Sequence, residues 1–310
     1  MNRRSAVRRL AAASAVSFFG RLFGRSWADL PDFRSESRLV LLDVSVKSGN
    51  GALVSGLSKE SFQVFENGKL QPLTVFANVD VPVTLGILVD ESFSMTPKRL
   101  DVIEAAQDLI HESNPNDEVF VLNFNDTVKR GLPDGVLFSD DINQLREALY
   151  RGRSQGKTAL NDAVVEGLQQ LKQGRRDKET LVLVSDGGDN ASRHTRKEML
   201  EMVKASSATV YTIGLFTAED PDKDPVILKD IARMSGGEVY FPQGPAEMAP
   251  VCRQIARDIR ARYTLGYVPQ EGNGVERRIG VRVAASGHKK LIAHTRPGYR
   301  YEEAADRKNQ

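Results

Sequence analysis

Between residues 82 and 260 the sequence alternates short apolar runs with stretches of helical periodicity. The apolar runs are VTLGILV (83–89), EVFVLNF (118–124), TLVLVS (180–185), TVYTIGL (209–215) and EVYF (238–241). Strands that are apolar on both faces are typical of a parallel sheet covered by helices on both sides. The pattern therefore predicts a doubly wound, mostly parallel α/β domain over residues 82–260. Residues 127–132 follow the second run after only two residues, which predicts one antiparallel edge strand.

Two of the helical stretches carry apolar residues at a spacing of three and four, which predicts their buried faces. In RLDVIEAAQDLIHE these residues are Leu100, Ile103, Ala106 and Ile110. In ALNDAVVEGLQQLK they are Leu160, Val164, Leu168 and Leu171. We expect both helices to pack against the sheet.

The segments on either side of this block have a different pattern, with strands and tight turns but no helical periodicity. Residues 29–80 include Asn67-Gly68, a strong signal for a short hairpin, and residues 261–301 contain three further strand-like runs. Each segment is too small to bury a core alone. We therefore expect the two to form one small β-sandwich-like domain in which the α/β domain is inserted, followed by a polar tail over residues 302–310.

The N-terminus reads as an export signal over residues 1–28. Four arginines precede a short apolar run, and Ser26-Trp27-Ala28 offers a cleavage site, in an arrangement similar to a twin-arginine signal. A basic amphipathic terminus is the alternative. Cleavage after Ala28 would remove six arginines and no acid, so the formal net charge of +2 would become −4. The remaining chain then has no basic excess to indicate nucleic-acid binding, and we expect a periplasmic or extracellular protein.

Two further features exclude classes of protein. No segment is apolar over the length that a transmembrane helix needs. The single cysteine, Cys252, excludes an internal disulfide and a cysteine-based zinc site. Its neighbours Val251, Ile255 and Ile259 lie at helical spacing, so we expect a buried core thiol.

Polar residues follow two of the predicted strands directly. Asp90, Ser92 and Ser94 follow the first strand, Asp186 follows the third, and Thr158 stands where another helix begins. Ligands of open α/β sheets bind beyond the carboxyl ends of the strands, where these residues are expected to meet. Carboxylate and hydroxyl oxygens are hard ligands that suit Mg²⁺, Mn²⁺ or Ca²⁺. Neutral hydroxyl ligands would leave such a cation able to attract a further carboxylate.

These residues resemble the metal-ion-dependent adhesion site of the von Willebrand factor A family, which reads D-x-S-x-S, then a threonine, then an aspartate before glycine. The resemblance implies that Ser92, Ser94 and Thr158 bind the metal directly, and that Asp90 and Asp186 act through water. The segments VSGLSKESFQVFENGKLQPLTVF and RYTLGYVP resemble bacterial proteins related to the same family. Phe93 and Lys157 replace residues that are commonly glycine, and with Glu91 and Asp189 we expect them to form the ligand rim.

Three other interpretations of the same residues exist. The five could merely cap the helices that follow them. Asp90 could be the nucleophile of a Mg²⁺-dependent phosphatase of the haloacid dehalogenase type, although Ser92 stands where that chemistry needs a second acid. Finally, GRSQGKT (152–158) is similar to the phosphate-binding loop of a nucleotide hydrolase, but Arg151 occupies the position of the first glycine and no strand precedes the motif.

The sequence thus predicts an exported, divalent-cation-dependent protein-binding module that is not an enzyme. Its partner would be a protein that presents an Asp or Glu carboxylate to the metal, with no role for nucleotide or nucleic acid.

Overall fold

The α/β part of the chain is built on a six-stranded sheet. The computed structural model describes residues 39–216, 220, 222–270 and 275–301. The strand order is β10-β9-β8-β5-β6-β7, and all pairs are parallel except β6 with β7. The strands are β5 (Val83–Asp90), β6 (Glu118–Phe124), β7 (Val128–Arg130), β8 (Lys178–Ser185), β9 (Thr209–Gly214) and β10 (Val239–Tyr240). The predicted doubly wound fold and its antiparallel edge strand are confirmed.

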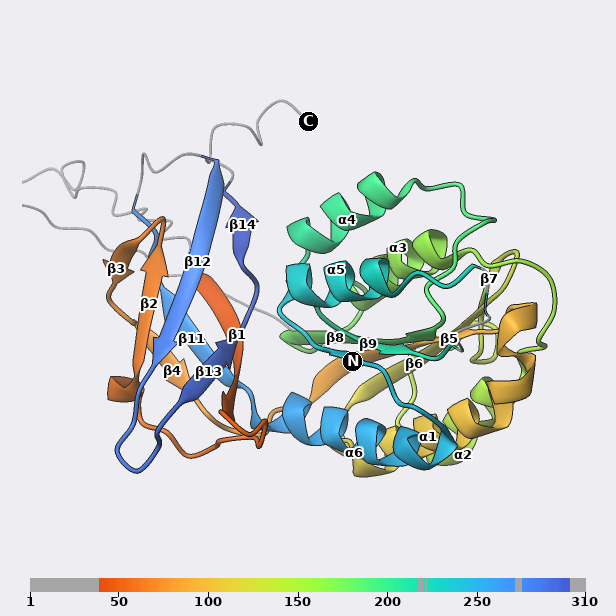
Figure 1. Ribbon diagram of the computed structural model, residues 1–310, viewed down its shortest axis with the longest axis horizontal. Coiled ribbons are helices and arrows are strands. Elements are labelled where there is room, and N and C mark those ends of the chain that lie inside the picture. Colours follow the sequence, from red (N-terminus) through yellow and green to blue (C-terminus); the bar gives the residue numbers. More distant parts are fainter. Residues whose placement is uncertain (1–38, 217–219, 221, 271–274, 302–310) are drawn as a thin grey trace, which may run out of the picture. The chain divides into compact units, whose positions relative to one another are not determined.

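Helices cover both faces of this sheet (Figure 1). One face carries α1 (Arg99–Glu112), α2 (Ile142–Tyr150) and α6 (Pro245–Ala261), and the other carries α3 (Leu160–Leu171), α4 (Arg196–Ala205) and α5 (Pro225–Ser235). A 3-10 helix, η3 (Phe93–Lys98), leads from β5 into α1. The core between these layers is dominated by strand residues that are buried on both sides, as the continuous apolar runs predict.

The predicted apolar face of α1 is wrong at its first member. Leu100 is 63% exposed, whereas the buried residues of the helix include Val102, Ile103, Ala106 and Leu109. At 3.6 residues per turn, Leu100 lies about 120° around the helix from Ala106 and so falls outside the buried stripe. The prediction for α3 is confirmed at all four positions, Leu160, Val164, Leu168 and Leu171.

The strands before and after the α/β part pair with each other in two antiparallel sheets. One sheet has the order β13-β1-β11-β4 and the other β14-β12-β2-β3. Their strands are β1 (Val40–Ser48), β2 (Phe62–Glu66), β3 (Lys69–Gln71), β4 (Val75–Ala77), β11 (Tyr263–Tyr267), β12 (Glu276–Val283), β13 (Leu291–His294) and β14 (Gly298–Arg300); a short 3-10 helix, η2 (Lys59–Ser61), precedes β2. Both sheets contribute to one core that includes Leu42, Val64 and Tyr263. The β2–β3 turn is the expected one, because Asn67 and Gly68 both have positive φ, 48° and 82°.

A buried polar cluster joins β1 to the α/β part. Asp258 of α6 accepts hydrogen bonds from Ser45 of β1 and from Tyr211 of β9, the latter at 2.5 Å. Arg262 donates to Tyr211 at 2.8 Å and to the backbone oxygens of Asp43 and Gly236 at 3.1 and 2.9 Å. We call Ser45, Tyr211, Asp258 and Arg262 the junction cluster. Its members are buried, so these hydrogen bonds hold β1 against α6 and β9 without exchange with water.

Cys252 is a core thiol, as predicted. It is buried in α6, and burial raises the pKa of its thiol to about 12, which keeps it protonated and unreactive.

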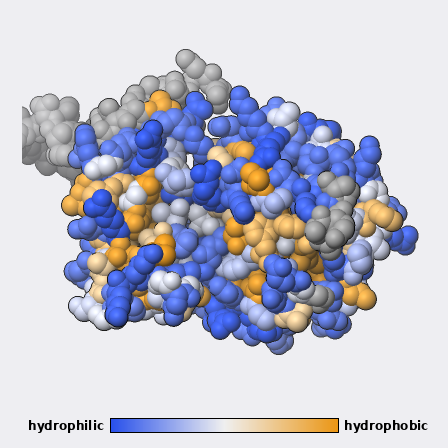
Figure 2. Space-filling view, in the orientation of Figure 1, coloured by the Kyte–Doolittle hydropathy of each residue, from blue (hydrophilic) through white to orange (hydrophobic). Residues whose placement is uncertain are grey.

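No helix of the described residues has both the length and the apolar character needed to cross a membrane. In Figure 2 hydrophobic residues gather over the strands of the two antiparallel sheets, and the surface over α4 is mostly hydrophilic. The predicted export signal and polar tail lie outside the described residues.

Candidate metal centre

The candidate residues that follow β5 and β8 meet at one edge of the sheet. These strands are adjacent and parallel over their whole length, so the loops after Asp90 and Ser185 emerge side by side. Ser94 Oγ donates to Asp186 Oδ2 at 2.5 Å, and Ser92 Oγ lies 3.1 Å from Ser94 Oγ. Two hydroxyls and a carboxylate from opposite loops therefore form a continuous row of oxygen atoms.

Asp90, two residues before Ser92, is 2% exposed. Its Oδ1 accepts from the backbone N–H of Ser92 at 2.8 Å, and its Oδ2 accepts from Ser185 Oγ at 2.5 Å. Burial raises the pKa of Asp90 to about 7, the charge of Asp186 adds to that rise, and the hydrogen bonds from Ser185 and Ser92 oppose it. The contact of Ser185 with Asp90 was not predicted from sequence. A polar residue at the end of an otherwise apolar strand could have indicated that Ser185 belongs to the site.

Thr158 is held between the two loops by its backbone. Its N–H donates to Asn190 Oδ1 at 2.9 Å, and its carbonyl accepts from the N–H groups of Asn190 and Ala191 at 2.9 and 3.0 Å. On the other side, Phe93 N–H donates to the carbonyl of Gly156 at 3.3 Å. The five candidate residues thus lie on three loops that hydrogen-bond to one another. Asn190 therefore fixes the loop that carries Thr158.

The same loop lacks the features of a phosphate-binding loop. The backbone N–H groups of Gln155, Lys157, Thr158 and Ala159 donate to the protein acceptors Glu91 O, Asp126 Oδ1, Asn190 Oδ1 and Asn125 O. Gly156 has a φ of +74°, and a Cβ there would lie 1.9 Å from Asp126 Oδ2, so its glycine serves a close approach to Asp126. The segment follows α2 rather than a strand. A nest of free amides is what such a loop needs, and these amides are already used.

The four predicted rim residues have different surroundings. Phe93 is 75% exposed and Lys157 is also exposed. Glu91 is buried, contrary to the expectation that it lies on the rim. Its side chain is 1% exposed, pairs with Arg99 Nε at 2.8 Å and accepts from Ser154 Oγ at 3.1 Å. These contacts anchor the 152–157 loop. A buried, paired carboxylate cannot face a ligand.

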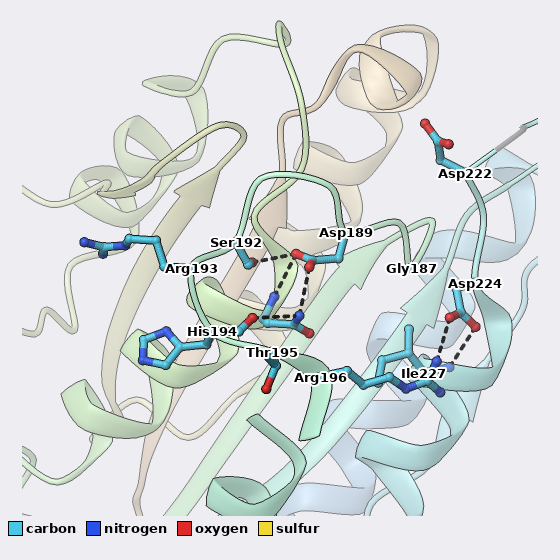
Figure 3. Close-up of a pocket in the computed structure, with 11 residues that line it drawn as sticks. Gly187, Asp189, Ser192, Arg193, His194, Thr195, Arg196, Asp222, Asp224 and Ile227 are labelled. Atoms are coloured by element: carbon cyan, nitrogen blue, oxygen red, sulfur yellow. Dashed lines mark hydrogen bonds and ion pairs between the residues drawn. The ribbon is translucent and has the colours of Figure 1, made fainter. Parts of the chain in front are cut away.

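The fourth, Asp189, belongs to a cavity of about 420 Å³ beside Gly187 (Figure 3). Its carboxylate accepts from Asn161 Nδ2 at 2.8 Å and Ser192 Oγ at 2.5 Å, so it holds the 187–196 loop to α3.

The arginine and histidine side chains along this cavity are paired with carboxylates of the protein. Arg196 pairs with Asp224 at 2.9 Å, and His194 Nδ1 lies 2.6 Å from Asp162 Oδ1. Asp162 also accepts from backbone N–H groups of residues 193 and 194, and these hydrogen bonds hold the pKa of its carboxyl at about 2, against the opposing effect of burial. The positive charges on this side of the candidate centre are therefore compensated within the protein.

Comparisons with known proteins agree with this fold. Residues 85–188 match the family model of the von Willebrand factor type A domain. A solved structure, von Willebrand factor type A from Catenulispora acidiphila, aligns with a TM-score of 0.53 at 16% identity, over 87% of this chain and 76% of that chain. A mussel byssus protein, proximal thread matrix protein 1 with a zinc-occupied MIDAS motif, aligns with a TM-score of 0.48 at 16% identity, over 58% of this chain and 48% of that chain.

One curated relative is similar in sequence. The Synechocystis protein named "Uncharacterized protein sll0103" is 24% identical over 178 residues, which are 56% of this chain and 41% of that protein. The match thus spans less than half of the relative's length. The residues matched by the family model contain β5, β6, β8 and the loops after β5 and β8. Over residues 85–188 the α/β domain of this chain therefore matches the von Willebrand factor type A family.

Proposed function

We propose that this protein is a divalent-cation-dependent protein-binding module, exported from the cytoplasm. The observation that carries the proposal is the row of oxygen atoms from Ser92, Ser94 and Asp186, together with the buried carboxylate of Asp90, which accepts from the Ser92 N–H. Hydroxyl and carboxylate oxygens are the ligands that Mg²⁺, Mn²⁺ and Ca²⁺ prefer. The match of residues 85–188 to a family of interaction domains supports binding, rather than catalysis, as the role.

The donor set fits a cation that retains positive charge for a partner. Ser92, Ser94 and Thr158 would offer neutral oxygen atoms, and Asp90 and Asp186 would hold the metal with or without intervening water. A dication in this setting would supply the electrostatic attraction for a carboxylate. The partner is then a protein that presents an Asp or Glu side chain at the edge of the sheet.

The phosphatase alternative has less support. A nucleophilic aspartate needs a free oxygen atom to attack phosphorus. Both carboxylate oxygens of Asp90 accept hydrogen bonds within the protein, from Ser92 N and from Ser185 Oγ, at 2.8 and 2.5 Å. Two residues further on stands Ser92, whose hydroxyl is a poor general acid at neutral pH.

Thermal melting with and without Mg²⁺ tests the proposed centre. A metal that binds only the folded state stabilises it by about 2.7 kcal/mol when its concentration is 100 times Kd. We expect Mg²⁺ to raise the Tm of the wild type, and Ser92→Ala to abolish that rise with little change in the metal-free Tm. Ser207→Ala, an exposed serine on the amino-end side of β9, is the matched control and should keep the rise. A wild type that binds no divalent cation in calorimetry contradicts the proposal.

Export rests on the sequence of residues 1–28 alone. N-terminal sequencing of the protein from an envelope fraction is expected to begin near Asp29. A cytoplasmic product that begins at Met1 would count against export and leave the metal centre untouched.

A further inference from the structure

We infer, on the basis of the proposed function, that the partner segment is an acidic peptide stretch with an apolar side chain beside its metal-bound carboxylate. Two features next to the candidate centre recognise these two properties. The first is the basic loop, which we define as residues 151–157, and the second is the aromatic ring of Phe93.

The basic loop carries more positive charge than the protein neutralises. Arg151, Arg153 and Lys157 are all exposed, and none forms an ion pair with a described residue. Two carboxylates contact the loop: Glu91 is neutralised by its ion pair with Arg99, and Asp126 accepts from the backbone N–H of Lys157 at 3.2 Å. One acid against three cations leaves an excess of positive charge at this surface. Charge complementarity therefore selects a partner with several carboxylates.

Backbone hydrogen bonds place this loop directly against the candidate centre. Gln155 N–H donates to the carbonyl of Glu91 at 2.8 Å, one residue before Ser92. Arg99 Nη2 donates to the carbonyl of Gly152 at 2.7 Å, which fixes the start of the loop. The opposite flank is the cavity of Figure 3, whose arginine and histidine side chains are paired with Asp224 and Asp162. A partner bound at the metal would thus find uncompensated charge on the side of the basic loop.

Phe93 supplies the apolar half of the recognition. Its side chain is 75% exposed although its neighbours Ser92 and Ser94 point their hydroxyls into the oxygen row. Burying an aromatic side chain at an interface contributes strongly to affinity, and such residues dominate binding energies. The ring therefore favours an aliphatic or aromatic residue next to the carboxylate that reaches the metal.

Carboxylates fit the basic loop better than a phosphate group does. Phosphate sites combine positive charge with free backbone amides. In this loop the N–H groups of Gln155, Lys157 and Thr158 already donate to protein acceptors, so the loop offers dispersed charge without a nest.

A displayed library of random dodecapeptides tests the inference. The purified full chain is panned in Mg²⁺, and bound phage are eluted with EDTA. We expect the eluted peptides to be rich in Asp and Glu and to carry an apolar residue beside one of them. For one selected peptide, R151S/R153S/K157S should weaken Kd about tenfold, because each exposed charge pair contributes modestly and three act together. Phe93→Ala should weaken the same peptide by a similar factor and lose the preference for the apolar residue.

The control triple variant carries the same change of charge in the part of the chain that forms the two antiparallel sheets and their connections. It replaces the exposed lysines Lys59, Lys69 and Lys289 by serine. We expect it to change Kd by less than about twofold, because distant charges are screened by salt. Peptides of no net acidity, or equal Kd values for the two triple variants, would overturn the inference while leaving the metal centre intact.

Two other outcomes are distinct from these. If EDTA elutes no peptide and calorimetry detects no metal, the proposed function has failed. If inorganic phosphate at millimolar concentration displaces the peptide from the wild type but not from R151S/R153S/K157S, the basic loop is a phosphate site and the inference is wrong.

Discussion

Two buried polar clusters in this molecule differ in how their charges are compensated. In the junction cluster the carboxylate of Asp258 lies 3.8 Å from Arg262 Nη1 and accepts from Ser45 and Tyr211. In the candidate centre Asp90 and Asp186 share only hydroxyl and backbone donors, with no described arginine or lysine hydrogen-bonded to either. In the first cluster the buried carboxylate has a buried cation beside it, whereas the second has a local excess of negative charge. A buried excess of this kind is what a cation would relieve.

The largest expected change in stability comes from removing the positive charge of the junction cluster. Arg262→Ala leaves the Asp258 carboxylate buried without its cation, which we expect to cost about 3–5 kcal/mol of the free energy of unfolding. Chemical denaturation followed by circular dichroism measures the loss. Arg257→Ala, an exposed arginine of the same helix, should cost less than about 0.5 kcal/mol. Equal losses of unfolding free energy for Arg262→Ala and Arg257→Ala would show that the charge of Arg262 does not stabilise the junction cluster.

A smaller effect is expected from pH at the candidate centre. Because the pKa of Asp90 is raised to about 7, its protonated form is favoured in the metal-free fold. The corresponding contribution to stability is therefore present at low pH and is lost as pH rises through about 7. Protons and metal compete for this carboxylate, so the Kd for Mg²⁺ should rise about tenfold between pH 8 and pH 6.

Calorimetry at the two pH values measures this change. Asp117, whose pKa burial raises to about 6, lies at the amino end of β6 and gives the control. Asp117→Asn should leave the pH dependence of Mg²⁺ binding as it is in the wild type. If the Mg²⁺ affinity is the same at pH 6 and pH 8, Asp90 does not take part in metal binding.

The last prediction compares the same substitution, Asp→Asn, in the two polar clusters. We expect it to stabilise the protein in the candidate centre and to destabilise it in the junction cluster. Asp186→Asn removes one of two adjacent carboxylates, so the metal-free protein at pH 8 should gain about 1 kcal/mol of stability and no longer respond to Mg²⁺. Asp258→Asn removes the counter-charge of Arg262 and should destabilise the protein. Urea denaturation in EDTA gives both values. If both substitutions destabilise the protein, the negative charge of Asp186 is compensated in the candidate centre as well.

The sequence predicts the α/β part well because its strands are buried on both faces. Each of the five apolar runs became a parallel strand whose ends differ from the prediction by at most two residues, and the loops after Asp90 and Ser185 met as expected. The order of residues within a strand shows what is buried, but not which distant group a polar side chain contacts. For that reason the burial of Glu91 and the contact between Ser45 and Asp258 could not be foreseen.

The domain boundaries predicted from sequence remain a prediction, although strands from both flanks pair with each other. The metal ligands likewise remain a prediction. Side-chain oxygen atoms of Ser92, Ser94 and Asp186 lie together, but which residues bind a metal depends on the ion as well as on the protein.

The direction of β5 has a mechanical consequence. Its first residue, Val83, follows β4 after five residues, and its last, Asp90, is part of the candidate centre. Tension between a captured partner and the antiparallel sheets would therefore run lengthwise along this strand. Seven residues of β5 are paired with β6 and seven with β8. Such a pull would load these hydrogen bonds in shear, all at once, instead of peeling them apart one by one.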